Sequence, residues 1–162
     1  MKIVFMVVAV CLGLLAGCAS HQSVQTSKAK ASAAGQEFET NDDFKIESAV
    51  YGYLLERRPW GNGEYGAIFL EGSGDRVAAL IRKFPHHVPP LKPVARAQPV
   101  PNQAPLDKDT GKPGLILSAK AVDPTNGVSE AIGTWNGGEA VSGTSAFVLM
   151  KADGTWTIQS VQ

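Results

Sequence analysis

Three glycines in this sequence have the spacing of a phosphate-binding loop. Gly61, Gly63 and Gly66 spell G-x-G-x-x-G. The dinucleotide-binding fingerprint needs a strand before these glycines and a helix after them. Here a helical pattern comes first and a strand pattern follows, so we expect a tight helix-to-strand turn and no nucleotide cofactor.

Two short motifs could suggest a metal. His86 and His87 are adjacent, so in an extended chain their side chains point to opposite faces, and the folded part offers no further His or Cys to complete a zinc site. The run 107–111, Asp-Lys-Asp-Thr-Gly, is similar to the start of a calcium loop. That loop requires Gly at its sixth position and Glu at its twelfth, which here are Lys112 and Ser118. We therefore predict no metal and a polar turn at 107–111.

Ser73 is the only serine in a setting that suggests a nucleophile, between Gly72 and Gly74 at a strand-to-helix junction. The G-x-S-x-G pattern of a nucleophile elbow is incomplete, because Glu71 and Asp75 occupy its outer positions. A role at the start of a helix explains Ser73 more simply. The carboxylates show no spacing that marks an acid and base pair, so we predict that the chain is not an enzyme.

The two cysteines are both close to the N-terminus. Cys11 lies in an apolar run, Ile3 to Leu15, which follows Lys2 and has the length of the hydrophobic region of an export signal. A membrane-spanning helix needs about 20 apolar residues, and polar residues follow this run too soon. We expect residues 1–17 to be a removable signal peptide.

The end of that run, Leu15-Ala16-Gly17-Cys18, resembles the lipobox of bacterial lipoproteins. The resemblance implies that Leu15, Ala16 and Gly17 are recognised by the lipoprotein signal peptidase, and that Cys18 carries diacylglycerol and an acylated amino group. Several acyl chains give stable membrane anchoring. Ala19 and Ser20 lack the Asp that favours inner-membrane retention, so the resemblance implies the outer membrane, with the protein facing the periplasm.

The remaining chain predicts a tether and one domain. Residues 18–41 are mostly small and polar and bury too little surface to fold, so we expect a flexible tether. Residues 42–162 have the size of a single globular domain. The 15 basic and 15 acidic side chains balance, which argues against nucleic acid as a partner.

The first half of that domain predicts two helices and a strand. Asp42 or Asp43 can cap a helix that runs to about Arg58, before Pro59. One face of it carries residues at helical spacing, which are Ile46, Val50, Tyr53, Leu54 and Arg57. The run 64–71 has the length and composition of a buried strand. Ser73 or Asp75 can cap a second helix, whose apolar residues recur at helical spacing; these are Val77, Leu80, Ile81 and Phe84.

The second half predicts strands. Seven prolines between positions 85 and 105 allow only an edge strand over 91–98. An antiparallel meander follows at 114–122, 128–135, 140–151 and 155–161, with Asn136-Gly137 and Asp153-Gly154 as hairpin turns. The predicted class is α+β: two N-terminal helices packed on a curved antiparallel sheet that ends in a meander.

Several motifs resemble a group of uncharacterised secreted bacterial α+β domains. They are Phe69-Leu70-Glu71-Gly72, the helix end Arg82-Lys83-Phe84, the "pp-V-kp" strand of residues 90–94, the D-x-x-T-G-k turn of residues 107–112, and the closing dG-x-W-x-v of residues 153–158. Many members of the group have Ser or Cys after the "pp-V-kp" strand, where this chain has Val94-Ala95-Arg96-Ala97. The layout also resembles cystatin-like and nuclear-transport-factor-two-like folds, which host both enzymes and binding proteins.

These observations favour a lipid-anchored, non-catalytic domain that binds an envelope protein. Trp135, beside a predicted turn, is the residue we would test for partner binding. One alternative is a pocket between the helices and the concave face of the sheet that binds a small molecule or supports weak catalysis. Another is a lipid-anchored immunity or inhibitor protein.

Overall fold

The structure, a computed structural model, describes residues 38, 40–61 and 63–162. This range does not include the predicted signal peptide, nearly all of the predicted tether, or the residues of the lipobox resemblance, which are Leu15, Ala16, Gly17 and Cys18. Within the described residues no helix is long and apolar enough to cross a membrane.

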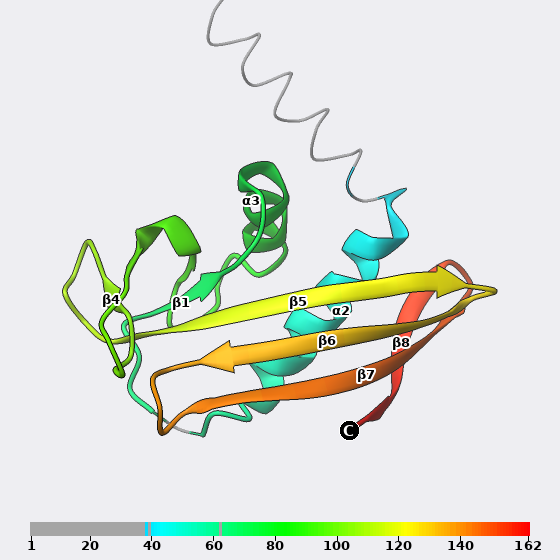
Figure 1. The fold of residues 1–162 in the computed structure, drawn as a ribbon. Helices are drawn as coiled ribbons and strands as arrows, with labels where there is room; N and C mark the ends of the chain where they lie inside the picture. Colours follow the sequence, from blue (N-terminus) through cyan, green and yellow to red (C-terminus); the bar gives the residue numbers. More distant parts are fainter. Residues whose placement is uncertain (1–37, 39, 62) are drawn as a thin grey trace, which may run out of the picture. The chain divides into compact units, whose positions relative to one another are not determined.

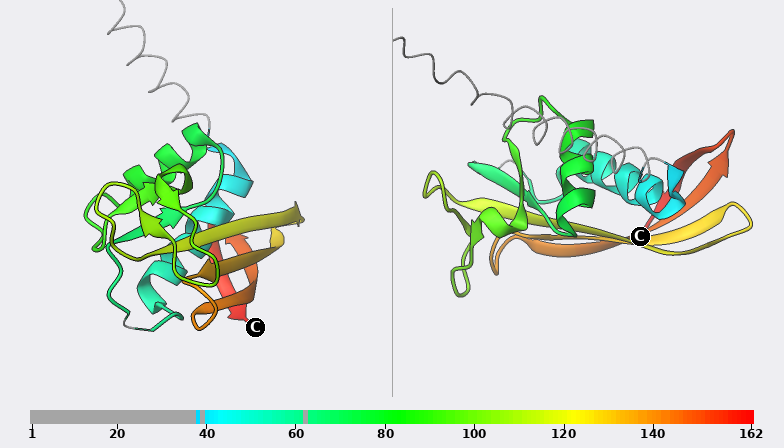
Figure 2. Two further views of the ribbon diagram at one scale, coloured as in Figure 1. Left: turned by 60° about the vertical axis from the view of Figure 1, so that its left-hand side comes forward. Right: turned by 90° about the horizontal axis from the view of Figure 1, so that it is seen from above.

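The described part has the predicted α+β class, with helices α2 (Asp42–Arg57) and α3 (Gly74–Lys83) on one face of a six-stranded sheet (Figures 1 and 2). The strand order is β2-β1-β5-β6-β7-β8. The strands are β1 (Ala67–Leu70), β2 (Leu91–Pro93), β5 (Gly114–Thr125), β6 (Val128–Asn136), β7 (Ser142–Ala152) and β8 (Thr155–Val161).

The predicted purely antiparallel sheet is wrong at one end, because β1 pairs in parallel with both β2 and β5. The chain leaves β1, forms α3 and returns as β2, and such a helical crossover joins parallel strands. Every residue of β1 is buried. An uninterrupted apolar run is typical of a parallel strand that is covered on both faces.

Helix α2 begins one residue earlier than expected. Asn41, rather than Asp42 or Asp43, is the N-cap, and its side chain accepts a hydrogen bond from Phe44 N at 3.2 Å. Arg58 ends the helix in a left-handed conformation. The predicted buried face is confirmed for Ile46, Val50 and Leu54, and Tyr53 is partly buried against the same core. The prediction is wrong for Arg57, which is exposed.

The meander is confirmed, but its turns differ in detail. The Asp153-Gly154 turn has the positive φ angles expected, 50° and 77°. The β6–β7 connection is a longer loop, residues 137–141, with positive φ at Gly138 rather than in an Asn136-Gly137 turn. A two-residue turn at Asn126-Gly127, with φ 53° and 77°, joins β5 to β6. Its Asn-Gly dipeptide is a strong hairpin signal, although this turn was not among those predicted.

The proline-rich segment forms a small second layer. The predicted edge strand over 91–98 divides into β2, a 3-10 turn (Val94–Arg96) and β3 (Ala97–Gln98), and β3 pairs with β4 (Leu106–Asp107) in a separate two-stranded sheet. Val94 and Ala97 pack with Phe69 and Ile116. The sheet is therefore covered on both faces near β1.

The space between α2 and the middle of the sheet is filled by side chains. Leu54 and Phe147 are completely buried or nearly so in the core under α2, whereas Phe69, also buried, lies on the other face of the sheet. At Gly133 in β6 an added Cβ would lie 2.9 Å from the Phe147 ring and 3.0 Å from both Leu54 and Val50. Glycine is therefore required here so that α2 can approach the sheet.

We predict that Gly133→Ala lowers the free energy of unfolding by about 1–3 kcal/mol, because the added methyl group overpacks a filled core. Urea unfolding followed by circular dichroism measures the change. Gly74→Ala is the matched control, since nothing lies within 4 Å of its Cβ and alanine favours a helix. Equal stability of the Gly133→Ala protein and the native protein would show that the core is not filled at this point.

Candidate functional site

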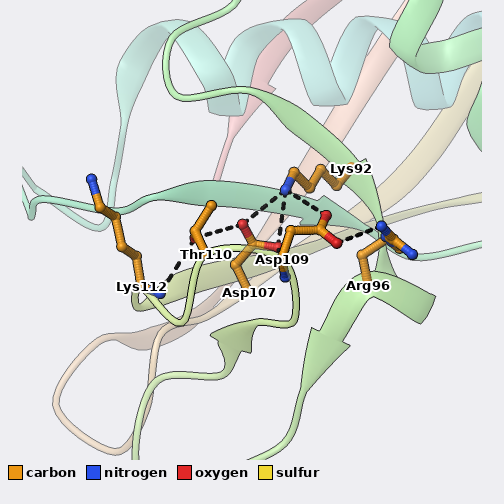
Figure 3. A network of polar contacts seen from close by, with 6 residues as sticks. All are labelled: Lys92, Arg96, Asp107, Asp109, Thr110 and Lys112. Carbon is orange, nitrogen blue, oxygen red and sulfur yellow. Dashed lines mark hydrogen bonds and ion pairs between the residues drawn. The ribbon is translucent and has the colours of Figure 1, made fainter.

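Charged side chains gather where β2 meets the second layer (Figure 3). Lys92 Nζ lies 2.8 Å and 3.0 Å from the two carboxylate oxygens of Asp107 and 2.9 Å from Asp109. Arg96 contacts the other oxygen of Asp109. We call these four residues the charged clamp.

Asp107 is the centre of the clamp and is almost completely buried. Its carboxylate also accepts hydrogen bonds from the Thr110 hydroxyl at 2.7 Å and from Asp109 N at 3.3 Å. Its backbone carbonyl accepts a bond from Gly111 N at 2.7 Å, which closes the polar turn. The predicted polar turn at 107–111 is thus confirmed, and its two aspartates bind Lys92 and Arg96.

The pKa directions in the clamp do not suit proton transfer near neutral pH. Hydrogen bonds from Lys92 hold the pKa values of both Asp107 and Asp109 below their usual range, and the same bonds raise the pKa of Lys92. The aspartates stay ionised and the lysine stays protonated. A general acid or base needs a pKa close to the working pH, so the clamp is suited to fastening the second layer.

A second polar contact joins the two helices. Arg76 Nε of α3 lies 2.7 Å from a carboxylate oxygen of Glu47 in α2. Burial raises the pKa of Glu47, and the bond from Arg76 acts in the opposite direction. The Tyr51 hydroxyl donates to the carbonyl of Glu71 at 3.1 Å. Each group has a partner within the fold, as in a structural ion pair.

The outer face of β5–β8, opposite the helices, carries apolar side chains in the open. We call it the open face. Its most exposed apolar residues are Val122, Val128, Ile132 and Met150, with exposed fractions of 40–49%. Val128 lies opposite Met150 in the register of β6 and β7. Grouped apolar side chains of this kind mark interaction surfaces.

The open face has few charges. Lys120 lies opposite Ile132 and Glu130 lies opposite Val122, so one charge of each sign sits among the exposed apolar residues. Ser118 and Thr134 form a cross-strand hydroxyl pair at 2.6 Å on the same face. Because Glu130 alternates with Val128 and Ile132 on this face, the exposed apolar side chains surround one carboxylate, and the surface is mixed in composition.

A separate groove of about 620 Å³ lies where the end of α2 meets the loop after α3. Leu55 and Phe84 contribute apolar surface, and Arg58 donates a hydrogen bond to the carbonyl of Val88 at 3.1 Å. His86 and His87 both line it, and the His87 ring nitrogen Nδ1 lies 2.7 Å from the carbonyl of Pro89. Among the described residues, no group of three or more His, Cys, Asp or Glu could hold a metal ion.

Trp135 lies on the helix-facing side of β6. It is partly buried against the main core, and its ring covers Gly143, where an added Cβ would be 2.3 Å from the indole. Ser73 occupies the N-cap position of α3 but makes no side-chain capping bond. The open face was not predicted from the sequence. The alternation of exposed and buried residues along β6 is the signal that could have indicated it.

Comparisons with known proteins give no relative: no family model, curated protein or solved structure matches this chain.

We predict that Asp107→Asn destabilises the protein near neutral pH, because Lys92 loses its buried charged partner. The folded-state pKa of Asp107 is depressed, so its stabilising effect is complete above its ordinary value of 3.8 and is lost as the pH falls through the lower folded value. The stability difference between native and Asp107→Asn proteins should therefore be largest near neutral pH and shrink below about pH 4. Urea midpoints across pH measure it.

Glu139→Gln is the control, because Glu139 is exposed in the β6–β7 loop. It should leave the stability unchanged near neutral pH. A stability difference for Asp107→Asn that stays constant from neutral to strongly acidic pH would contradict the assigned ionisation.

Proposed function

We propose that this chain is a lipid-anchored protein of the bacterial envelope, attached through Cys18, whose periplasm-facing domain binds another envelope protein without catalysis. The lipobox resemblance of residues 15–18 supports the anchor. The pKa directions in the charged clamp argue only against proton transfer by Lys92 and Asp107 near neutral pH. The outer membrane is the proposed location, because Ala19 and Ser20 carry no inner-membrane retention signal.

The observation that carries the binding function is the open face. Val122, Val128, Ile132 and Met150 lie on adjacent strands and remain 40–49% exposed. We propose an envelope protein with an apolar surface as the partner, because one lysine and one glutamate leave no net charge here to attract a strongly charged ligand. Trp135 packs at the margin of the core and would contribute less than Ile132.

The groove beside α2 supports a second candidate function, the binding of a small molecule. It combines apolar surface from Leu55 and Phe84 with polar groups from Arg58 and the two histidines. This combination is typical of ligand sites. The groove lies away from the filled space between α2 and β6, where the sequence had placed a pocket.

A cystatin-like or nuclear-transport-factor-two-like relationship is part of the proposal. A long helix packed on an antiparallel meander supports it. The parallel strands β1 and β2 and the small second sheet depart from a simple meander.

Replacing the proposed lipid site should release the protein from the membrane. We predict that Cys18→Ser either appears in the soluble fraction or keeps its leader and runs as a larger precursor, because the thiol that takes up diacylglycerol is gone. Fractionation with immunoblotting measures this. Cys11→Ser is the matched control and should sediment like the native protein, since Cys11 lies in the proposed leader. Membrane sedimentation of Cys18→Ser at the native level, with normal leader removal, would contradict lipid anchoring.

A photo-crosslinking amino acid at Val128 tests the open face in intact cells. We predict one reproducible crosslinked protein, which Ile132→Asp abolishes because a carboxylate is placed in an apolar contact. Val88→Asp changes an equally apolar and more exposed position beside the groove, 77% exposed, and should leave the product intact. Loss of the crosslinked product with Val88→Asp and its retention with Ile132→Asp would contradict binding at the open face and indicate the groove instead. Thermal unfolding confirms that both variants fold.

A further inference from the structure

The two edges of the main sheet differ in their protection. At one edge, β2 is only three residues long and contains Lys92 and Pro93, with Pro89 and Pro90 just before it. At the other edge, β8 runs from Thr155 to Val161 without a proline or a charged side chain. Natural sheets usually protect an edge with short strands, prolines or lysines. The β2 edge follows that rule along its length, whereas β8 carries only a register shift near Gln159.

The backbone of β8 is oriented for further pairing. Lys151 N donates to Gly127 O on the β6 side, at 2.8 Å, so Lys151 and its β8 partner Trp156 form a non-hydrogen-bonded pair. Trp156 therefore directs its N–H and C=O away from β7, and by alternation Ile158 does the same. Within the described part of the chain, no strand pairs with this edge.

We propose that β8 pairs antiparallel with β8 of a second copy of this chain, about a two-fold axis at Thr157. In this register Trp156 lies opposite Ile158 of the second copy, and each exchanges backbone N–H···O=C bonds with the other. Thr157 lies opposite its own counterpart in a non-hydrogen-bonded pair, in which side chains approach closely.

The side chains of β8 favour a second copy as the occupant. An antiparallel strand pairing with itself satisfies two-fold symmetry, because every contact occurs twice. The register joins an aromatic side chain to a β-branched one on the helix side and two threonines on the outer side, and both kinds of cross-strand pair are stabilising. Since residues 155–161 carry no charged side chain, self-pairing brings no like charges together along the strand.

The register shift near the end of β8 limits the length of the pairing. The β7–β8 ladder is interrupted between Val148 and Leu149, which leaves Gln159 without a direct partner. A bulge of this kind bends the strand, so the contact is confined to the run around Thr157. The two open faces would become continuous on one side of a joined sheet. This inference does not depend on the proposed partner at the open face.

A cysteine scan in the full-length chain tests the register. We expect Thr157→Cys to form a disulfide-linked dimer in an oxidising cell envelope, because the two cysteines would be directly opposed. Thr155→Cys is the matched control, also exposed and on the same strand, and it would lie opposite Gln159 instead. It should give several-fold less dimer on non-reducing gels. No dimer from Thr157→Cys, or equal dimer from both variants, overturns the proposal.

Charged substitutions at Thr157 distinguish pairing between two copies of β8 from pairing with a strand of another protein. Thr157→Lys and Thr157→Glu should each reduce co-purification of two differently tagged copies several-fold, since like charges would face each other. Co-expression of the Lys and Glu variants should restore it. Failure of this restoration, with both variants folded and exported, overturns pairing at Thr157. Crosslinking from Val128 is read separately, so either proposal can fail alone.

Discussion

The buried contact between Asp107 and Lys92 is the interaction on which the rest of the arrangement depends. An almost fully buried carboxylate is costly unless charged and polar groups surround it, and here Lys92, Thr110 and a backbone N–H do so. The contact joins the edge strand β2 to the turn after β4. It thereby fastens the proline-rich segment over Phe69, which would otherwise be an exposed aromatic side chain on the outer face.

The outer face of the sheet is covered at one end and open at the other. Near β1 the face is closed by Val94 and Ala97, whereas over β6 and β7 it stays open at Ile132 and Met150. The same clamp thus closes the β1 end of the outer face and limits its open part to the antiparallel strands. The functional proposals follow from that division, since the closed end presents prolines and paired charges, and the open end presents unpaired apolar groups.

Local signals in the sequence predicted much of the fold. The 3.6-residue spacing of Ile46, Val50 and Leu54 located the buried face of α2, and Asp153-Gly154 located a turn. The parallel pairing of β1 could not be obtained in this way, because parallel and antiparallel partners are chosen by the crossover through α3 and by contacts distant in sequence. The N-cap of α2 is Asn41 rather than the predicted Asp42 or Asp43, because several adjacent polar residues can all fulfil that role.

The candidate site was less predictable than the fold. Asp107 and Asp109 stood out in the sequence, but their partner Lys92 lies 15 residues before Asp107, across a proline-rich segment that gives no periodic signal. Ile132 and Met150 are ordinary apolar residues of a strand. They face solvent because α2 and α3 pack on the other face of the sheet. Their exposure is a property of the assembled layers.

Membrane attachment would change how strong the contacts of this domain need to be. The open face offers a small number of half-exposed apolar side chains, and the bulge near Gln159 keeps the β8 edge short, so neither surface alone implies tight binding in dilute solution. Two molecules held on one membrane meet at a high effective concentration, which can raise the overall binding strength without any new contact. The proposed lipid on Cys18 would therefore suit a domain with modest docking surfaces, because attachment would supply the proximity that those surfaces do not.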